Sequence, residues 1–104
     1  MDFCVVFVTA SGLKEAEKIS EALLKEKLAA CVNIVRGVRS KYWWKGRIEK
    51  ASESLLMIKT RKSKIPRLIR KVKKIHSYTV PEVIALPILQ GNSDYLRWIG
   101  RSVK

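Results

Sequence analysis

The sequence predicts a single α+β domain, residues 1–104, of the split β-α-β type: strand, helix, two strands, helix, strand, and then a terminal helix. Two observations predict this fold. Short apolar, β-branched runs alternate with two stretches whose apolar residues recur at helical spacing. Between those stretches, two strand-like runs meet at Lys45-Gly46, with no room for a helix between them. Because 47% of the residues are hydrophobic, the chain can bury a core of its own.

The first strand and the first helix are predicted within residues 3–28. Residues 3–9 form a short apolar run rich in β-branched side chains, which is typical of a buried strand. Ser11-Gly12 then breaks the pattern, and serine is a residue type that caps helices. Residues 13–28 are predicted to form an amphipathic helix of about four turns. Its apolar positions are Ala16, Ile19, Leu23 and Leu24.

The centre of the chain predicts an unusually long hairpin. Residues 29–45 have strand character, and at about 3.3 Å per residue they would span roughly 55 Å, far beyond a usual strand. Gly37 is expected to mark a bulge or bend that redirects this strand. Lys45-Gly46 is expected to form a tight turn, after which residues 47–60 return as the third strand.

The second helix is predicted to begin near Ser63 and to end at His76. Ser63 is expected to cap it, and Pro66 then falls in the first turn, where the missing N–H does no harm. One face is apolar and the other is entirely basic. The apolar residues are Ile65, Leu68, Ile69, Val72 and Ile75, and the basic ones are Lys64, Arg67, Arg70, Lys71, Lys73 and Lys74.

The last strand and a short helix complete the ferredoxin-like order. Residues 83–89 predict a fourth strand that contains Pro87. Because proline has no N–H to donate to a strand ladder, this strand is expected at a sheet edge or to be locally irregular. Asn92 is expected to start the final helix, which carries Tyr95 and Trp98.

Charge and hydropathy limit the location and the partners of the chain. The formal net charge is +13, which predicts attraction to polyanions but is also compatible with simple solubility. No run of about 18 apolar residues exists, so we expect no membrane span. The first residues lack the basic start of a secretory signal, and we therefore expect a cytoplasmic protein.

Five local strings, in this order and with these gaps, resemble the CutA divalent-cation tolerance family from one end of the chain to the other. The strings are AACVN at 29–33, SKYWWKGRIE at 40–49, KTR at 59–61, HSYTVPE at 76–82 and DYLRW at 94–98. The resemblance implies a tight homotrimer in which long hairpins pair between neighbours, similar to the PII signalling proteins. It also implies a role in the tolerance of divalent cations, copper above all, through weak metal binding or PII-like signalling.

The candidate metal ligands are His76, Cys31 and Cys4. Family members thought to bind copper resemble each other in a cysteine at the end of the first strand and a second histidine before the histidine of the fourth string. The matching positions here are Val8 and Ile75, so only His76 remains of that set. Imidazole and thiolate suit copper, and a weakly bound copper or other divalent cation is the expected cofactor. The alternatives are a helix-capping role for His76 and burial of both cysteines as small hydrophobic residues.

Tyr42, Trp43 and Trp44 stand beside the hairpin turn and are predicted to form the trimer interface. Because neighbouring strand residues point to opposite faces, Trp43 and Trp44 cannot both enter one core. Large rings in such a place are typical of protein interfaces. A platform on which nucleic-acid bases stack is the alternative interpretation.

A basic nucleic-acid-binding module of ferredoxin-like fold is the alternative function. Residues 59–74 contain nine basic residues and no acidic one. RNA-recognition domains share the predicted element order, but they stack bases on aromatic residues of the third strand. Residues 47–60 contain no aromatic residue, so a solvated basic face is preferred and no nucleic-acid partner is expected.

The sequence contains no catalytic pattern, and we expect a protein that is not an enzyme. No glycine-rich phosphate loop is present. Cys31 and His76 are a possible nucleophile and base, but no third group that would orient them is suggested.

Overall fold

A computed structural model describes residues 2–104 and confirms the predicted α+β, ferredoxin-like fold. The element order is strand, helix, two strands, helix, strand, helix, with one short 3-10 turn before the second helix. The elements are β1 (Phe3–Ala10), α1 (Leu13–Lys25), β2 (Cys31–Trp44), β3 (Arg47–Arg61), the 3-10 turn η1 (Lys62–Lys64), α2 (Ile65–Ile75), β4 (Val83–Pro87) and α3 (Ser93–Ser102). Within residues 2–104, no helix has the length and apolar character that a bilayer crossing would require.

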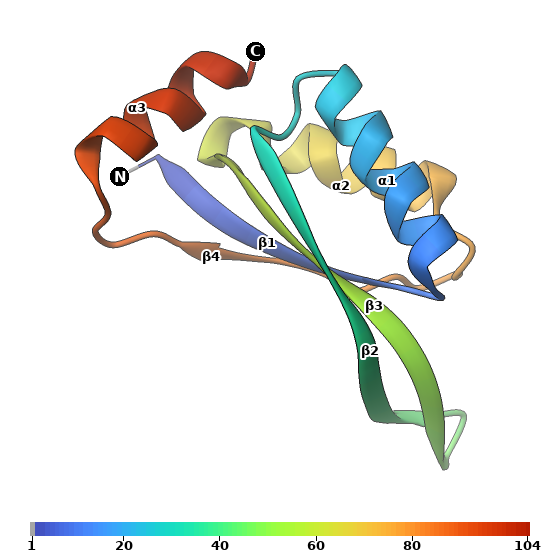
Figure 1. Cartoon of the computed structure of the whole chain (residues 1–104). Coiled ribbons are helices and arrows are strands. Elements are labelled where there is room, and N and C mark those ends of the chain that lie inside the picture. The colour runs from blue at the N-terminus through green and yellow to red at the C-terminus, as the bar shows by residue number, and fades with distance from the viewer. Residues whose placement is uncertain (1) are drawn as a thin grey trace.

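The four strands form one antiparallel sheet in the order β2-β3-β1-β4. Helices α1 and α2 lie side by side over one face of the sheet, and α3 contacts β1 and β3 near the end where the chain starts (Figure 1). β4 is an edge strand, as Pro87 predicted, and it ends at Pro87 rather than continuing to residue 89. The missing proline N–H agrees with the edge position, because an edge strand needs no donor on its outer side. One further bond follows Pro87, since the Ile88 N–H donates to the Phe3 carbonyl at 2.9 Å.

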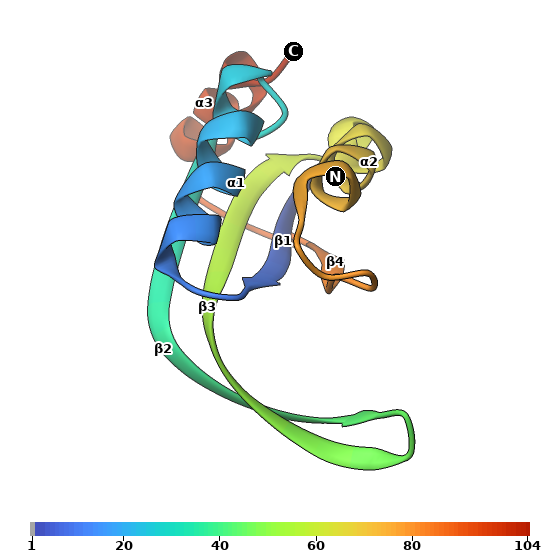
Figure 2. The ribbon, with the colours of Figure 1, turned by 90° about the vertical axis from the view of Figure 1, so that its right-hand side faces the viewer.

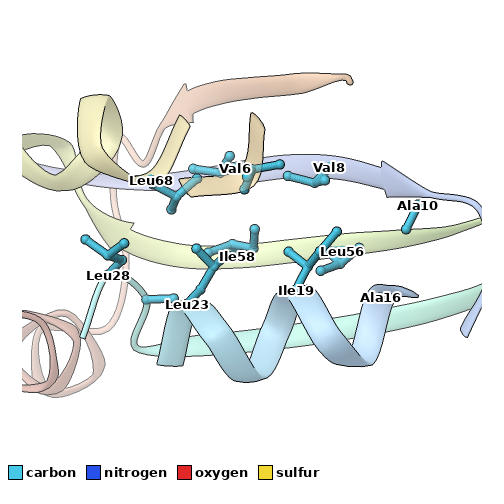
Figure 3. Packing of buried hydrophobic residues seen from close by; sticks show 12 residues of the cluster. Val6, Val8, Ala10, Ala16, Ile19, Leu23, Leu28, Leu56, Ile58 and Leu68 are labelled. Atoms are coloured by element: carbon cyan, nitrogen blue, oxygen red, sulfur yellow. The ribbon is translucent and has the colours of Figure 1, made fainter. Parts of the chain in front are cut away.

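The core lies between the sheet and the two helices. Every second residue of β1 from Cys4 to Ala10 is buried, which is the alternation of a strand with one covered face. Leu56 and Ile58 of β3 point into the same layer and meet α1 and α2 residues, as Figure 3 shows. The fully buried helical residues include Ile19, Leu23, Leu68 and Val72.

Both ends of α1 differ from the prediction. Gly12 is the N-cap, and the Ser11 side chain makes no capping bond; instead the Glu15 carboxylate accepts the Ser11 N–H at 2.9 Å. The helix ends at Lys25, three residues earlier than expected. Lys27 adopts a positive φ of 60°, and the Leu28 N–H donates to the Leu23 carbonyl at 2.9 Å. This left-handed turn satisfies a terminal carbonyl and directs Leu28 into the core.

The predicted Ser63 cap of α2 is wrong, whereas the Pro66 position is confirmed. Ser63 lies inside η1, and Lys64 precedes α2 without a side-chain capping bond. An N-cap residue is normally extended, but Lys64, which precedes α2, is already helical, and the last extended residue is Arg61 before η1. Pro66 occupies the first turn of α2. At the other end of the chain, the Asn92 side chain caps α3 by accepting the Asp94 N–H at 2.9 Å.

The β2–β3 hairpin extends far beyond the rest of the sheet. β1 covers β3 only as far as the Ala10–Ser54 pair, so residues 38–53, here called the arm, form a two-stranded ribbon. Figure 2 shows this arm curving away beneath the body of the fold. The register shifts between Val35 and Val38, and Gly37 there has a φ of 71°, which confirms the predicted bulge.

The hairpin closes with the tight turn that the sequence predicted. Trp44 pairs with Arg47, and the two turn residues Lys45 and Gly46 have φ values of 52° and 76°. Two positive values are typical of a type I′ turn, whose twist matches that of the flanking strands. β2 starts at Cys31, two residues later than predicted.

Candidate functional site

The structure does not bring the three candidate metal ligands together. Cys4 is buried on the helix-covered face of β1. Cys31 neighbours Val32, which packs against the core, so Cys31 points to the opposite face of the sheet. His76 follows α2 and contacts the Thr9 carbonyl. Thr9 lies five residues along β1 from Cys4, which at the rise of a strand is about 16 Å. Within residues 2–104, no three His, Cys, Asp or Glu side chains are grouped to hold a metal ion.

The His76 imidazole is fully buried, and both of its nitrogens make hydrogen bonds. Nε2 lies 2.8 Å from the Thr9 carbonyl oxygen, and Nδ1 lies 3.0 Å from the Tyr78 backbone nitrogen. Since the Tyr78 N–H can only donate and the carbonyl can only accept, the ring is neutral with its proton on Nε2. The backbone of His76 ends α2 by donating to Val72, while the side chain joins the end of β1 to the following loop.

Glu15 fixes the same loop from the side of α1. Its two carboxylate oxygens accept the Ser11 N–H at 2.9 Å and the Ser77 N–H at 2.7 Å. Burial acts to raise the pKa of Glu15, but the hydrogen bonds from Ser11 and Ser77 outweigh it and lower the pKa from 4.5 to about 2. The carboxylate also lies 3.8 Å from His76 Nδ1. Residues 76–78 are therefore held by groups that are far apart in the sequence.

Tyr78 extends this network to the base of the arm. Its hydroxyl donates to Oε2 of Glu53 at 2.7 Å, and its ring lies 4.6 Å from the His76 ring. Burial and the hydrogen bond to Glu53 raise the pKa of the Tyr78 hydroxyl. Only 7% of Glu53 is exposed, which is unusual for a carboxylate. The loop after α2 is thereby fastened to β3 at the point where β1 ends.

A cavity of about 960 Å³ lies between the arm and the loop that contains Tyr78. The Glu53–Tyr78 pair stands in its wall, together with side chains from the end of β1 and both strands of the arm. The lining residues are Thr9, Ser11, Arg39, Ser40, Lys41, Tyr42, Trp44, Ala51, Ser52, Glu53, Tyr78, Thr79, Val80 and Glu82. The cavity thus combines aromatic rings, hydroxyl groups and charges of both signs.

The three aromatic residues of the arm lie on two different faces. Tyr42 and Trp44 line the cavity, whereas Trp43 pairs with Ile48 on the other face of the ribbon. Trp43 is 72% exposed and Ile48 is 60% exposed. The predicted opposite orientation of Trp43 and Trp44 is therefore confirmed. Their role in a trimer interface stays a prediction.

Sequence reasoning did not assign the network that surrounds the cavity. Tyr78 enters the sequence analysis only as part of the string at 76–82, and Glu15 has no assigned role there. Glu53 lies between two serines and has no neighbour in sequence that would mark it as buried. The single available signal was the position of Glu15 in the first turn of α1, where a carboxylate commonly accepts backbone N–H groups.

Comparison with known proteins gives concordant matches over nearly the whole chain. The model of the CutA1 divalent ion tolerance protein family matches residues 4–102. A Thermus thermophilus protein named divalent-cation tolerance protein CutA is 47% identical, over 91% of this chain and 92% of its own length. A rice protein named CutA 1, chloroplastic, is 48% identical over 96% of this chain, which spans only 56% of the rice sequence.

Solved structures of CutA1 proteins have the same fold as this chain. The crystal structure of CutA1 from Oryza sativa has a TM-score of 0.97 at 46% identity, covering 100% of this chain and 95% of that one. The Thermus thermophilus divalent cation tolerance protein has a TM-score of 0.96 at 44% identity, covering 98% and 99%. Both similarities include the long hairpin, because they extend over essentially all of the chain.

Proposed function

The chain belongs to the CutA1 divalent ion tolerance family, and on that basis we propose that it acts in divalent-cation tolerance as a homotrimer rather than as an enzyme. The observation that carries this proposal is the match over residues 4–102, together with relatives of similar length that bear the tolerance name. The names of the matched family and of those relatives are not enzyme names. The possible catalytic pair is not brought together: Cys31 pairs with Lys59 opposite Val5, whereas His76 contacts Thr9, four residues further along β1.

The arm supports the trimeric, PII-like assembly. A two-stranded ribbon is at best marginally stable by itself in water. The arm nevertheless displays Trp43 and Ile48 to solvent, where they would be covered by a neighbouring subunit. Among residues 2–104, no strand pairs with the outer edge of β2 or of β4, which leaves both edges available for pairing between subunits.

Copper or another divalent cation is proposed as a weakly bound ligand. A cation at His76 must displace either the bond to Thr9 or the one from Tyr78, because both ring nitrogens are engaged. Val8 and Ile75 offer no lone pair to compensate for this loss. Wild type is therefore expected to bind Cu(II) weakly in a calorimetric titration, and His76→Ala should remove what binding remains. Tight stoichiometric binding that survives the substitution would place the metal site elsewhere.

The proposed function is tested by growth under metal stress. A bacterial host that lacks its own family member is challenged with graded copper, with and without expression of this chain. Expression should raise the tolerated copper concentration, and Trp43→Asp, which places a charge on the proposed interface, should remove the gain. An equal gain from an unrelated basic protein, or no gain at all, would contradict the proposal.

We also propose a cytoplasmic location, although relatives carry the words chloroplastic and periplasmic in their names.

The basic nucleic-acid module is not favoured. The basic charge of α2 is its main support. β3 does not add to it, because it has no aromatic residue on which a base could stack. If the face of α2 is only solvated, RNA binding should be weak and should collapse as salt rises to about 0.15 M. Filter-binding or fluorescence anisotropy at several salt concentrations measures this directly.

A further inference from the structure

Helix α2 carries a row of positive charges on its outward side. Six cations occupy this side and the position just before the helix, and no acidic residue lies among them. They are called the basic stripe here: Lys64, Arg67, Arg70, Lys71, Lys73 and Lys74. None belongs to the arm or to an edge strand, which are the parts proposed to meet neighbouring subunits. We propose that the basic stripe binds inorganic polyphosphate, a linear chain of phosphate groups. This inference goes beyond the proposed function, which does not use α2.

The charges of the basic stripe repel one another in the free protein. Arg67 and Lys71 are four residues apart, as are Arg70 and Lys74, and like charges at this spacing destabilise a helix. Arg67 also lies in the first turn, beside the positive end of the helix dipole. The first turn holds no acidic residue, and no side-chain cap bond compensates there. A bound anion would relieve both unfavourable interactions.

Contacts within the subunit relieve little of this repulsion. Lys71 Nζ lies 2.6 Å from Oε2 of Glu26, and this is the single ion pair that the stripe makes among residues 2–104. The bond from Lys71 lowers the pKa of Glu26, and the charges of Arg67 and Lys74 act in the same direction. Three cations therefore share one carboxylate. Because Glu26 is exposed, the pair contributes little to stability.

Helix α1 shows how the same protein builds an exposed helix face from mixed charges. Lys18 and Glu21 are three residues apart, and Glu21 and Lys25 are four apart, so opposite charges are neighbours on its surface. Such pairs support a helix while keeping it soluble. α2 lacks them entirely, although it lies beside α1 on the same face of the sheet (Figure 1). Solvation alone therefore does not explain the one-sided composition of α2.

The surroundings of the stripe exclude partners that need more than charge. α2 has no aromatic residue for stacking a base and no Asn or Gln for reading one. None of its Ile, Leu and Val side chains is exposed, so it offers no apolar anchor to a protein partner. The exposed carboxylates of Glu17 and Glu21 on neighbouring α1 would oppose a flat anionic membrane.

A polyphosphate chain satisfies these limits. It carries charge on every phosphate and has neither bases nor apolar groups, so its partner needs only suitably spaced cations. Arg67, Arg70 and Lys74 are exposed and lie within two turns of α2, about 10 Å along the axis. One strand of phosphates can therefore contact all three. The forked guanidinium groups of the two arginines suit phosphate oxygens in particular.

The test uses the full-length protein in its native assembly, in buffer without divalent cations, at about 0.15 M salt. The probes are inorganic polyphosphate, an RNA homopolymer with as many phosphates, polyglutamate with as many charges, and phosphatidylglycerol vesicles. Calorimetry and competition should show polyphosphate bound at least about tenfold more tightly than RNA or polyglutamate, because its charges are the most closely spaced. The vesicles should not compete. No binding of polyphosphate, or equal binding of any other probe, would overturn the proposal.

The decisive comparison is between two triple variants that each remove three positive charges from the net +13. The stripe variant combines Arg67→Gln, Arg70→Gln and Lys74→Gln. The matched control changes three exposed lysines of α1, combining Lys14→Gln, Lys18→Gln and Lys25→Gln.

The stripe variant should bind polyphosphate at least about tenfold more weakly, whereas the control should lose less than about threefold. The dependence of log affinity on log salt should also become shallower by roughly 2, for three lost contacts at about 0.7 each. Without polyphosphate, the stripe variant should unfold at the wild-type midpoint or above it, because repulsion within α2 is removed. Equal losses of affinity in both variants would show that binding follows net charge alone and would overturn the proposal. A stripe variant clearly less stable than wild type would overturn it as well.

Discussion

The β2–β3 hairpin has two halves that follow the same backbone pattern but are stabilised by different means. In the covered half, Leu56 and Ile58 are fully buried between the sheet and the helices. In the arm, the strands continue with regular pairing to Trp44 and Arg47, yet Trp43 and Ile48 are exposed. Regular strand pairing therefore does not by itself tell where a core is. The arm carries large hydrophobic side chains, but within residues 2–104 Trp43 and Ile48 stay mostly exposed.

The largest effect that distinguishes the two halves should come from truncating one buried residue. Leu56→Ala should lower the free energy of unfolding by about 2–5 kcal/mol, because it removes buried methyl groups and leaves a cavity. Ile48→Ala on the same strand should leave the fold of the subunit intact, with a cost that depends on protein concentration. Denaturant unfolding followed by circular dichroism at two concentrations measures both. A large loss for Ile48→Ala that is independent of concentration would show that the arm is stabilised within its own subunit.

Acid should weaken the body of the fold, and not the arm, through Glu15 on α1. Its folded-state pKa of about 2 lies below the ordinary 4.5, so its contribution is complete above about pH 4.5 and is lost as the pH falls toward 2. With the side chain only 12% exposed, the shift corresponds to about 3 kcal/mol of stability. Glu15→Gln should remove most of that pH dependence. Glu17→Gln, an exposed neighbour on α1, is the matched control.

The measurement is the free energy of unfolding of wild type, Glu15→Gln and Glu17→Gln between pH 6 and pH 2.5. Identical pH slopes for wild type and Glu15→Gln would show that the carboxylate does not hold the loop after α2. The expected loss of slope belongs to the body of the fold, and substitutions on the arm should not reproduce it.

The bulge between the two halves should have a smaller energetic effect. Gly37 has a φ of 71° and open space around the position of a β-carbon, so a side chain there would meet only backbone strain. Gly37→Ala should therefore cost about 1 kcal/mol, and Gly37→Asn should cost less, because asparagine tolerates the left-handed region. Thermal or denaturant midpoints of the pair give the comparison. Equal costs would indicate that the bulge relaxes to another conformation when glycine is replaced.

The sequence predicts the strands, the bulge and the turn of the hairpin because each depends on local patterns. Glycine favours positive φ and proline favours a sheet edge, whatever surrounds them. The structure confirms the bulge at Gly37, the turn at Lys45-Gly46 and the edge position of the strand with Pro87. The helix ends were less predictable, because several local hydrogen bonds compete there. Ser11 and Ser63 have side chains that can cap a helix, but neither does so. The Ser11 N–H donates to Glu15, and Ser63 lies inside a 3-10 turn.

The candidate site was largely beyond the reach of sequence patterns. Ser77 and Glu15 are 62 residues apart, and Tyr78 and Glu53 are 25 apart, so no local spacing connects them. His76 was identified by type, but its hydrogen bonds to Thr9 and from Tyr78 depend on where β1 ends beside α2. Such contacts follow from the packing of elements, which periodicity does not specify.

The contrast between the covered half and the arm is tested most directly by the mass of the native assembly in solution. Light scattering or native mass spectrometry at micromolar concentration should give three times the subunit mass of 11.9 kDa. Trp43→Asp should shift the population toward the single-subunit mass while Leu56 and its neighbours keep the subunit folded. A wild-type protein that remains a folded monomer, with Trp43 and Ile48 still exposed, would contradict the interpretation of the arm as an intersubunit element.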